Sequence, residues 1–125
     1  ISRFIDLALK NEDITIYGDG LQTRTFCFVD DNIDACVNSL YSNQFLNDIV
    51  NIGNDIETKV IDLAQMIIGL TESKSKIIHL PPLEEGDMKR RMPDISKMKL
   101  LLRRELLPLE DGIKKILKNP LFLND

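Results

Sequence analysis

The chain has 125 residues, a length that predicts about one domain with one hydrophobic core. A hydrophobic fraction of 43% and a charged fraction of 29% exclude a disordered or fibrous chain. No apolar run approaches the roughly 18 residues of a membrane span. Acidic residues outnumber basic ones by 20 to 16, for a net charge of -4, the opposite of what a nucleic-acid binder usually carries. We therefore expect neither a membrane nor a nucleic-acid partner.

Helices and short strands alternate along the first part of the chain. Apolar residues at helical spacing predict a helix over residues 1–10, and a β-type run predicts a strand over residues 14–17. The glycines of residues 18–20 predict a turn, and residues 23–29 predict a second strand. A helix then runs to about Tyr41, with Asp30 or Asp31 as its expected N-cap. Its apolar residues share one helical face: Ile33, Cys36, Val37 and Leu40.

The second part continues the same alternation. A strand over residues 49–52 precedes a helix over residues 59–70, which Thr58 is expected to cap. Residues 76–80 predict another strand, followed by a charged loop over residues 83–93. The last predicted elements are a helix to about Leu102, which Asp94 is expected to cap, and a helix from Pro108 to about Lys118. Because short strands lie between helices and do not follow one another in hairpin pairs, the fold class is predicted to be α/β.

The chain shows no self-contained active site, so we expect no catalytic and no metal-ligating residue. The single histidine, His79, lies in an apolar strand and is interpreted as partly buried with one hydrogen-bond partner. Cys27 and Cys36 have no metal-site spacing and are interpreted as buried thiols, with a disulfide as the less favoured alternative. Gly18-Asp19-Gly20 follows a strand but opens no helix, which indicates a turn rather than a dinucleotide loop.

Several polar and aromatic residues lie where they can bind a ligand. Arg24 follows the glycine turn, and Arg91 lies in a proline-bounded loop; an arginine fork donates two parallel hydrogen bonds to a phosphate. The alternative for each arginine is a solvated surface position beside acidic residues. Tyr17 is either a wall for a ligand ring or an aromatic residue at the edge of the core. Asn51 either binds a ligand or caps its own turn.

Four blocks of sequence, in order over nearly the whole chain, carry a resemblance. They are Tyr17–Arg24 with the following Val29-Asp30-Asp31, Val50–Asn54, Arg91–Ile95 and Leu109–Ile113. They resemble the nucleotide-sugar epimerase/dehydratase family of extended short-chain dehydrogenases. The Gln22-Thr23-Arg24 triplet and the Arg-x-Pro-Asp-Ile block are most similar to UDP-glucuronate decarboxylases. The dTDP-glucose 4,6-dehydratases and UDP-glucose 4-epimerases share much of the pattern and stay as alternatives.

The resemblance implies a role for individual residues in binding a nucleotide sugar. Arg24 matches the family arginine on the nucleotide diphosphate, and Arg91 matches the second arginine of that site. Asn51 matches an asparagine at the nucleotide end of the site. The strand end along which the base lies is matched by Thr15, Ile16 and Tyr17. The chain departs from the family at Arg103-Arg104, where glycine-tryptophan is usual, so the preceding helix lacks its C-terminal glycine.

The resemblance also implies what lies outside this chain. The family's glycine-rich NAD loop and Tyr-x-x-x-Lys pair have no match in residues 1–125, although the full-length parent would use NAD. We therefore expect residues 1–125 to be the C-terminal substrate-binding region of a Rossmann-type enzyme, with the NAD-binding Rossmann half absent. The chain alone is expected to bind no NAD and to be inactive.

The expected partners are a UDP-sugar or other nucleotide sugar and the missing Rossmann domain. Self-association is expected where the faces that pack on that domain are uncovered. Cytoplasm is the default location. A stand-alone, non-catalytic nucleotide-sugar binding or interaction module is the alternative to an enzyme fragment.

Overall fold

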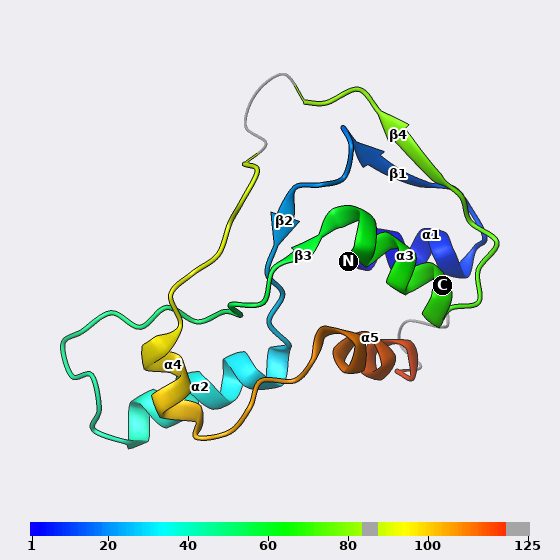
Figure 1. Ribbon diagram of the computed structural model, residues 1–125. Coiled ribbons are helices and arrows are strands. Elements are labelled where there is room, and N and C mark those ends of the chain that lie inside the picture. The colour runs from blue at the N-terminus through cyan, green and yellow to red at the C-terminus, as the bar shows by residue number, and fades with distance from the viewer. Residues whose placement is uncertain (84–87, 120–125) are drawn as a thin grey trace. The chain divides into compact units, whose positions relative to one another are not determined.

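A computed structural model describes residues 1–83 and 88–119 of the protein (Figure 1). The described chain forms two compact units. The first contains residues 1–24, 58–83, 88–91 and 113–119, and the second contains residues 25–57 and 92–112. Helix α5 (Leu109–Leu117) begins in the second unit and ends in the first.

The first unit is built on two parallel strands, β1 (Ile14–Tyr17) and β4 (Ile77–Leu80). Their register pairs Ile14 with Ile77 and Tyr17 with Leu80. Helices α1 (Ser2–Leu9) and α3 (Val60–Leu70) contact each other and β1 (Figure 1). The apolar side chains buried in this unit are aliphatic: Ile5, Ala8, Ile14, Ile16, Leu63, Ala64, Ile67 and Ile113. One polar side chain, Ser75, is buried with them. The predicted α/β class and these four predicted elements are confirmed.

A second, antiparallel pair joins β2 (Thr23–Arg24) to β3 (Thr58–Lys59). The predicted strand over residues 23–29 therefore ends at Arg24, because β3 offers only two partner residues. The predicted capping of α3 by Thr58 is wrong, since Thr58 belongs to β3. The first amides of α3 are satisfied instead by backbone: Val60 donates to the Gln22 carbonyl at 3.1 Å and Ile61 to the Gly20 carbonyl at 3.0 Å.

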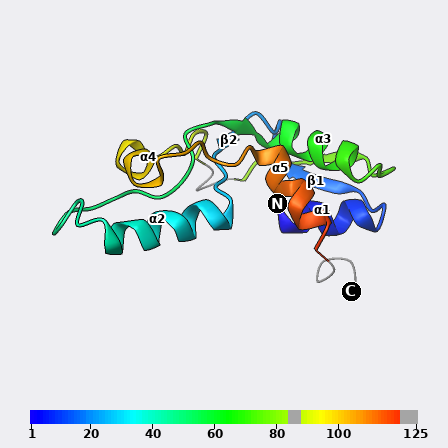
Figure 2. The same ribbon diagram turned by 90° about the horizontal axis from the view of Figure 1, so that it is seen from below.

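In the second unit, helices α2 (Val29–Tyr41) and α4 (Ser96–Leu102) lie beside each other (Figure 2). The Asn38 side-chain amide donates to the Leu101 carbonyl at 3.1 Å, which ties the two helices together. The core between them contains Ala35, Ile95, Met98 and Leu102. The Asp94 carboxylate accepts the Ser96 amide at 2.9 Å, so it supplies the predicted cap bond from one residue before the N-cap position, Ile95.

Asp31 is a buried carboxylate, with an exposed fraction of 1%. The predicted N-cap role of Asp30 or Asp31 is wrong, because α2 begins after Phe28 and makes no side-chain cap bond. The Asp31 carboxylate instead accepts the Arg104 guanidinium and, at 2.9 Å, the Leu107 amide. Arg104 also donates to the Asp34 carboxylate. The hydrogen bond to Asp34 is the largest cause of the raised pKa of the guanidinium, and the one to Asp31 is the second. Asp31 therefore fastens α2 to the segment after α4.

The end of α4 has no glycine, as the sequence predicts. Arg103 takes the left-handed conformation itself, with a φ of 53°, and its amide donates to the Lys99 carbonyl. A left-handed arginine is less favourable than a glycine there. This conformation lets the chain turn directly into Arg104, which makes the bonds to Asp31 and Asp34.

The apolar face of α2 is uncovered among the described residues. Exposed fractions are 53% for Ile33, 44% for Val37 and 78% for Leu40, whereas the buried residues of the helix are Asp31 and Ala35. The predicted burial of Cys36 is wrong, because it is exposed on the same helix. Cys27 is half-buried and also a free thiol, and burial raises its pKa.

The predicted strand over residues 49–52 is not formed. No strand of the described chain pairs with these residues, and Ile49 is 80% exposed. A strand needs a hydrogen-bonded partner, which local sequence does not supply. The predicted last helix is confirmed as α5. Within the described residues, no helix has the length and apolar character that crossing a membrane requires.

The burial and hydrogen bonds of Asp31 predict that its substitution destabilises the protein. Asp31→Ala should lower the free energy of unfolding by about 1.5–3 kcal/mol, because it removes a charged acceptor from the Leu107 amide and from Arg104. The matched variant Asp34→Ala removes an exposed carboxylate from the same arginine and should cost less than about 1 kcal/mol. Urea unfolding of the 125-residue chain measures both, and equal losses would contradict the assignment.

Candidate functional site

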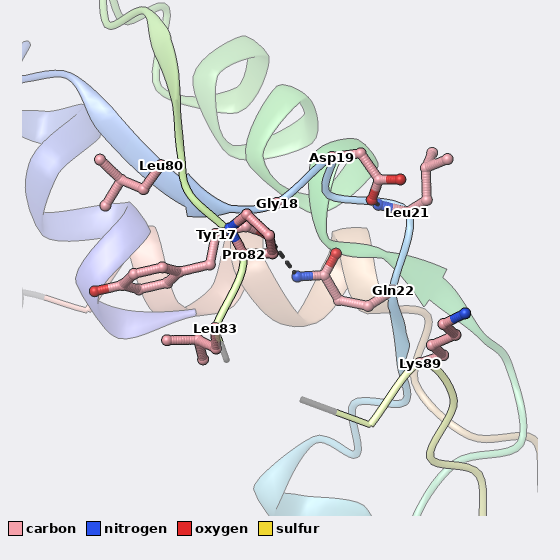
Figure 3. Close-up of a pocket in the computed structure, with 9 residues that line it drawn as sticks. All are labelled: Tyr17, Gly18, Asp19, Leu21, Gln22, Leu80, Pro82, Leu83 and Lys89. Atoms are coloured by element: carbon pink, nitrogen blue, oxygen red, sulfur yellow. Dashed lines mark hydrogen bonds between the residues drawn. The ribbon is translucent and has the colours of Figure 1, made fainter. Parts of the chain in front are cut away.

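A cavity of about 710 Å³ lies beside the turn that follows β1 (Figure 3). Its lining comes entirely from the first unit, from the turn, the end of β4 and the segment after it. The lining residues are Tyr17, Gly18, Asp19, Leu21, Gln22, Leu80, Pro82, Leu83 and Lys89. The volume falls within the roughly 300–1,000 Å³ of small-molecule sites.

Two glycines with positive φ build the turn, Gly18 at 68° and Gly20 at 76°. The Gly18 amide donates to the Leu80 carbonyl at 2.9 Å, which holds the turn against β4. At Gly20 the turn meets the start of α3, since a Cβ there would lie 3.0 Å from the Ile61 Cβ. Both the conformation and the close approach require glycine at this position. The predicted turn is therefore confirmed, and it fixes one wall of the cavity.

The cavity has an aromatic end and a polar end. Tyr17, the last residue of β1, points its ring toward the Leu80 and Leu83 end, and Gln22 and Lys89 lie at the other (Figure 3). The Gln22 side-chain amide donates to the Tyr17 carbonyl at 3.2 Å, which orients both residues. An apolar surface with a few placed polar groups is suited to a ligand that combines a ring with hydrogen-bonding or charged groups.

Three of the predicted site residues lie in β1. Tyr17 is 44% exposed and lines the cavity. Thr15 is half-buried and lies opposite Ile78. The side chain of Ile16 is 2% exposed and belongs to the core, so a ligand can meet this residue only through its backbone.

Arg24 lies on β2 and is half-buried. Its Nη1 donates to the Met88 carbonyl and to the Thr23 carbonyl, both at 2.7 Å. The Thr23 amide donates to the Lys89 carbonyl at 2.9 Å. Arg24 is not among the residues that line the cavity, but it fastens to β2 the segment that contributes Lys89.

The remaining two predicted residues belong to different units. Arg91 is exposed at the end of the first unit, whereas Asn51 belongs to the second. The Asn51 side-chain amide donates to the Asp94 carbonyl at 3.2 Å, which is a contact within its own unit. Hydrogen bonds from Ser96 hold the pKa of the neighbouring Asp94 carboxylate below its usual value.

Within the described residues, the His79 side chain has the one hydrogen-bond partner that the sequence predicts, although the residue is exposed rather than partly buried. Its Nδ1 lies 2.8 Å from the Gly18 carbonyl oxygen, at the cavity wall. Of the lining residues, only Tyr17 was a predicted site residue; those not predicted include Gln22, Lys89, Leu80, Pro82 and Leu83. The pairing of Tyr17 with Leu80 brings the last three beside the turn, and that long-range pairing has no local signal.

Comparison with known proteins shows which proteins this chain resembles. Residues 1–53 match the NAD dependent epimerase/dehydratase family. The chain is 42% identical over 94% of its length to UDP-glucuronic acid decarboxylase 1 of Danio rerio. It is 35% identical over 94% of its length to UDP-N-acetyl-alpha-D-glucosaminuronate decarboxylase of Bacillus cytotoxicus. The chain is related to the NAD-dependent epimerase/dehydratase family.

A solved structure supports the same family and the predicted fold. UDP-glucuronic acid 4-epimerase from Bacillus cereus, in complex with UDP-glucuronic acid and NAD, superimposes with a TM-score of 0.78 at 30% identity. The match covers 90% of this chain and 36% of that one. The chain spans 28% of the Danio rerio protein and 38% of the Bacillus cytotoxicus protein. The match to the C-terminal portion of a Rossmann-type epimerase/dehydratase is confirmed.

The cofactor of the family does not fit the glycine turn of this chain. A dinucleotide pyrophosphate is held where a glycine-rich turn opens a helix. Here the turn of residues 18–20 leads into β2. Residues 1–83 and 88–119 also contain no cluster of His, Cys, Asp and Glu side chains suited to a metal ion.

Substitution of Gly20 in the turn should affect stability differently from substitution of Gly69 in α3. Gly20→Ala should lower the free energy of unfolding by at least about 1–2 kcal/mol, because of its positive φ and its contact with Ile61. Gly69→Ala, in α3 with nothing within 4 Å of the added Cβ, should leave stability unchanged or raise it by up to about 1 kcal/mol. Thermal unfolding compares the two; equal effects would mean that Gly20 is not constrained.

Proposed function

We propose that the chain is the substrate-binding portion of an NAD-dependent enzyme that converts UDP-glucuronate to UDP-xylose and CO2. The observation that carries this proposal is the 42% identity to the Danio rerio decarboxylase across 94% of the chain. The second candidate is 4-epimerisation of the same substrate, favoured by the structural match to the Bacillus cereus epimerase. Both reactions use a UDP-linked uronic acid, so the proposed ligand is the same.

The uridine part of the substrate is proposed to occupy the cavity beside the turn. The Tyr17 ring offers a flat apolar wall, and the Gln22 amide and Lys89 ammonium offer polar contacts at the other end. The roles of Arg24 and Arg91 are to bind the diphosphate, since a guanidinium pairs with phosphate oxygens through two parallel N–H bonds. Asn51 is assigned to the nucleotide end of the substrate. In this arrangement the chain holds the substrate still and does not itself perform the chemistry.

The redox chemistry is assigned to another part of the enzyme. Bound NAD supplies reversible oxidation of the sugar, and this chain's glycine turn does not fit that cofactor. Residues 1–125 are therefore proposed to form the substrate-binding region, and a Rossmann domain outside them is proposed to bind NAD. The exposed apolar face of α2 is proposed to pack on that domain, because an uncovered face of this kind marks an interaction site.

A chimera tests the reaction without the rest of the native enzyme. This chain replaces the matching part of the Danio rerio decarboxylase. We expect the chimera to release CO2 from carboxyl-labelled UDP-glucuronate and to form UDP-xylose. Formation of the 4-epimer without CO2 would favour the second candidate, and no product from a folded, NAD-bound chimera would contradict both.

In that chimera, Arg24→Ala should weaken UDP-glucuronate binding by about 10- to 100-fold, because it removes charge-assisted bonds to the diphosphate. The affinity for NAD should be unchanged. The control is Arg3→Ala, which removes an exposed arginine from α1. Isothermal titration measures both ligands, and an unchanged affinity of Arg24→Ala for UDP-glucuronate would exclude the diphosphate role.

The exposed face of α2 predicts how the isolated chain behaves. We expect the 125-residue chain to self-associate at high concentration, and the double variant Val37→Ser, Leu40→Ser to be monomeric without a loss of stability. Leu9→Ser removes a leucine of α1 that is 38% exposed and should leave the self-association unchanged. Sedimentation velocity compares the three proteins; a monomeric wild type at high concentration would disprove the expectation.

A further inference from the structure

We propose that His79 is a positioning residue of the nucleotide site, and that its ring N–H fixes the turn that forms the cavity wall. This inference rests on the proposed function, because it gives that site a residue to which neither the sequence motifs nor the family match assigns a role. His79 does not line the cavity itself. It acts through the backbone of Gly18, which does.

Strand β4 holds both polar groups of Gly18 with two consecutive residues. The Leu80 carbonyl accepts the Gly18 amide at 2.9 Å, and His79 Nδ1 lies 2.8 Å from the Gly18 carbonyl oxygen. The parallel register places His79 opposite Ile16, two residues before Gly18. The histidine ring therefore reaches past the paired residues to the turn and extends the strand pairing by one bond.

The turn needs this bond more than an ordinary strand end would. Gly18 has a φ of 68° and no side chain, so its backbone has more accessible conformations than any other residue type. A rotation at Gly18 would also move the carbonyl of Tyr17, which the Gln22 amide holds at 3.2 Å. Tyr17, Gly18 and Gln22 all line the cavity. Fixing one carbonyl therefore preorganises the aromatic wall and the polar end together.

The acceptor decides which ring nitrogen carries the proton. A carbonyl oxygen only accepts, so Nδ1 must be protonated, and in the neutral ring Nε2 is then the unprotonated nitrogen. The neutral Nδ1–H form and the imidazolium both donate from Nδ1. The bond to Gly18 is therefore kept in either charge state of the ring.

The tautomer tests this assignment without any ligand. The chain has one histidine, so a sample with ¹⁵N-labelled histidine gives ring signals from His79 alone. We expect NMR of the neutral ring to show Nδ1 protonated and Nε2 unprotonated. A neutral ring protonated at Nε2 would overturn the proposal, because it could not donate to Gly18.

Binding of UDP to the 125-residue chain tests the positioning role. His79→Phe keeps an aromatic ring and removes the donor, and we expect it to weaken UDP binding by about 2- to 10-fold. His79→Asn places a donor near the position of Nδ1 and should recover most of the affinity. The control, Ile78→Phe, changes the adjacent residue of β4, which is 40% exposed, and should bind like the wild type.

Each outcome separates the two levels of the proposal. Equal affinities of the wild type and His79→Phe would overturn the positioning role and leave the proposed UDP site intact. A loss shared by His79→Phe and His79→Asn would also overturn it, because a donor would then not matter. A folded wild-type chain that binds no UDP would contradict the proposed site, while the tautomer would still decide the bond to Gly18.

Discussion

The first unit depends on the hydrogen bonds that join the turn after β1 to the first amides of α3. Val60 and Ile61 need acceptors at the start of the helix, and the carbonyls of Gln22 and Gly20 supply them in place of a capping side chain. The same turn ends β1 and begins β2, so one set of backbone bonds aligns two strands with a helix. The cavity follows from this arrangement, because its wall cannot move without breaking those bonds.

The second unit depends on a buried charged group, the carboxylate of Asp31. A carboxylate inside a protein is costly unless every strong bond that it can accept is made. Asp31 meets this condition because it accepts hydrogen bonds from Arg104 and from the Leu107 amide. Arg104 directly follows Arg103, the left-handed residue that ends α4. The opposite side of α2 remains apolar and exposed. The helix is thus fixed on one side, while apolar side chains on its other side are exposed in the described part of the chain.

Local patterns predicted most elements because the dominant signals were local. Helical spacing found α1, α3 and α5, and short apolar runs found β1 and β4. The strand predicted over residues 23–29 formed only at Thr23–Arg24, and the one predicted over residues 49–52 did not form, because a strand depends on a partner that its own residues do not encode. Asp31 was predicted as an N-cap, but its carboxylate accepts a long-range hydrogen bond from Arg104 instead. Tyr17 could be found as a candidate, whereas Leu80 and Lys89 reach the cavity only through pairing with distant residues.

The proposed role of the turn after β1 is to hold the uridine end of a UDP-sugar. The most direct measurement is a backbone amide NMR titration of the 125-residue chain with UDP-glucuronate. We expect the largest shifts on residues 17–24, on Leu80 and on Lys89, the segments that form and support the cavity. Shifts confined to the second unit, or none at saturating ligand with the chain folded, would contradict it.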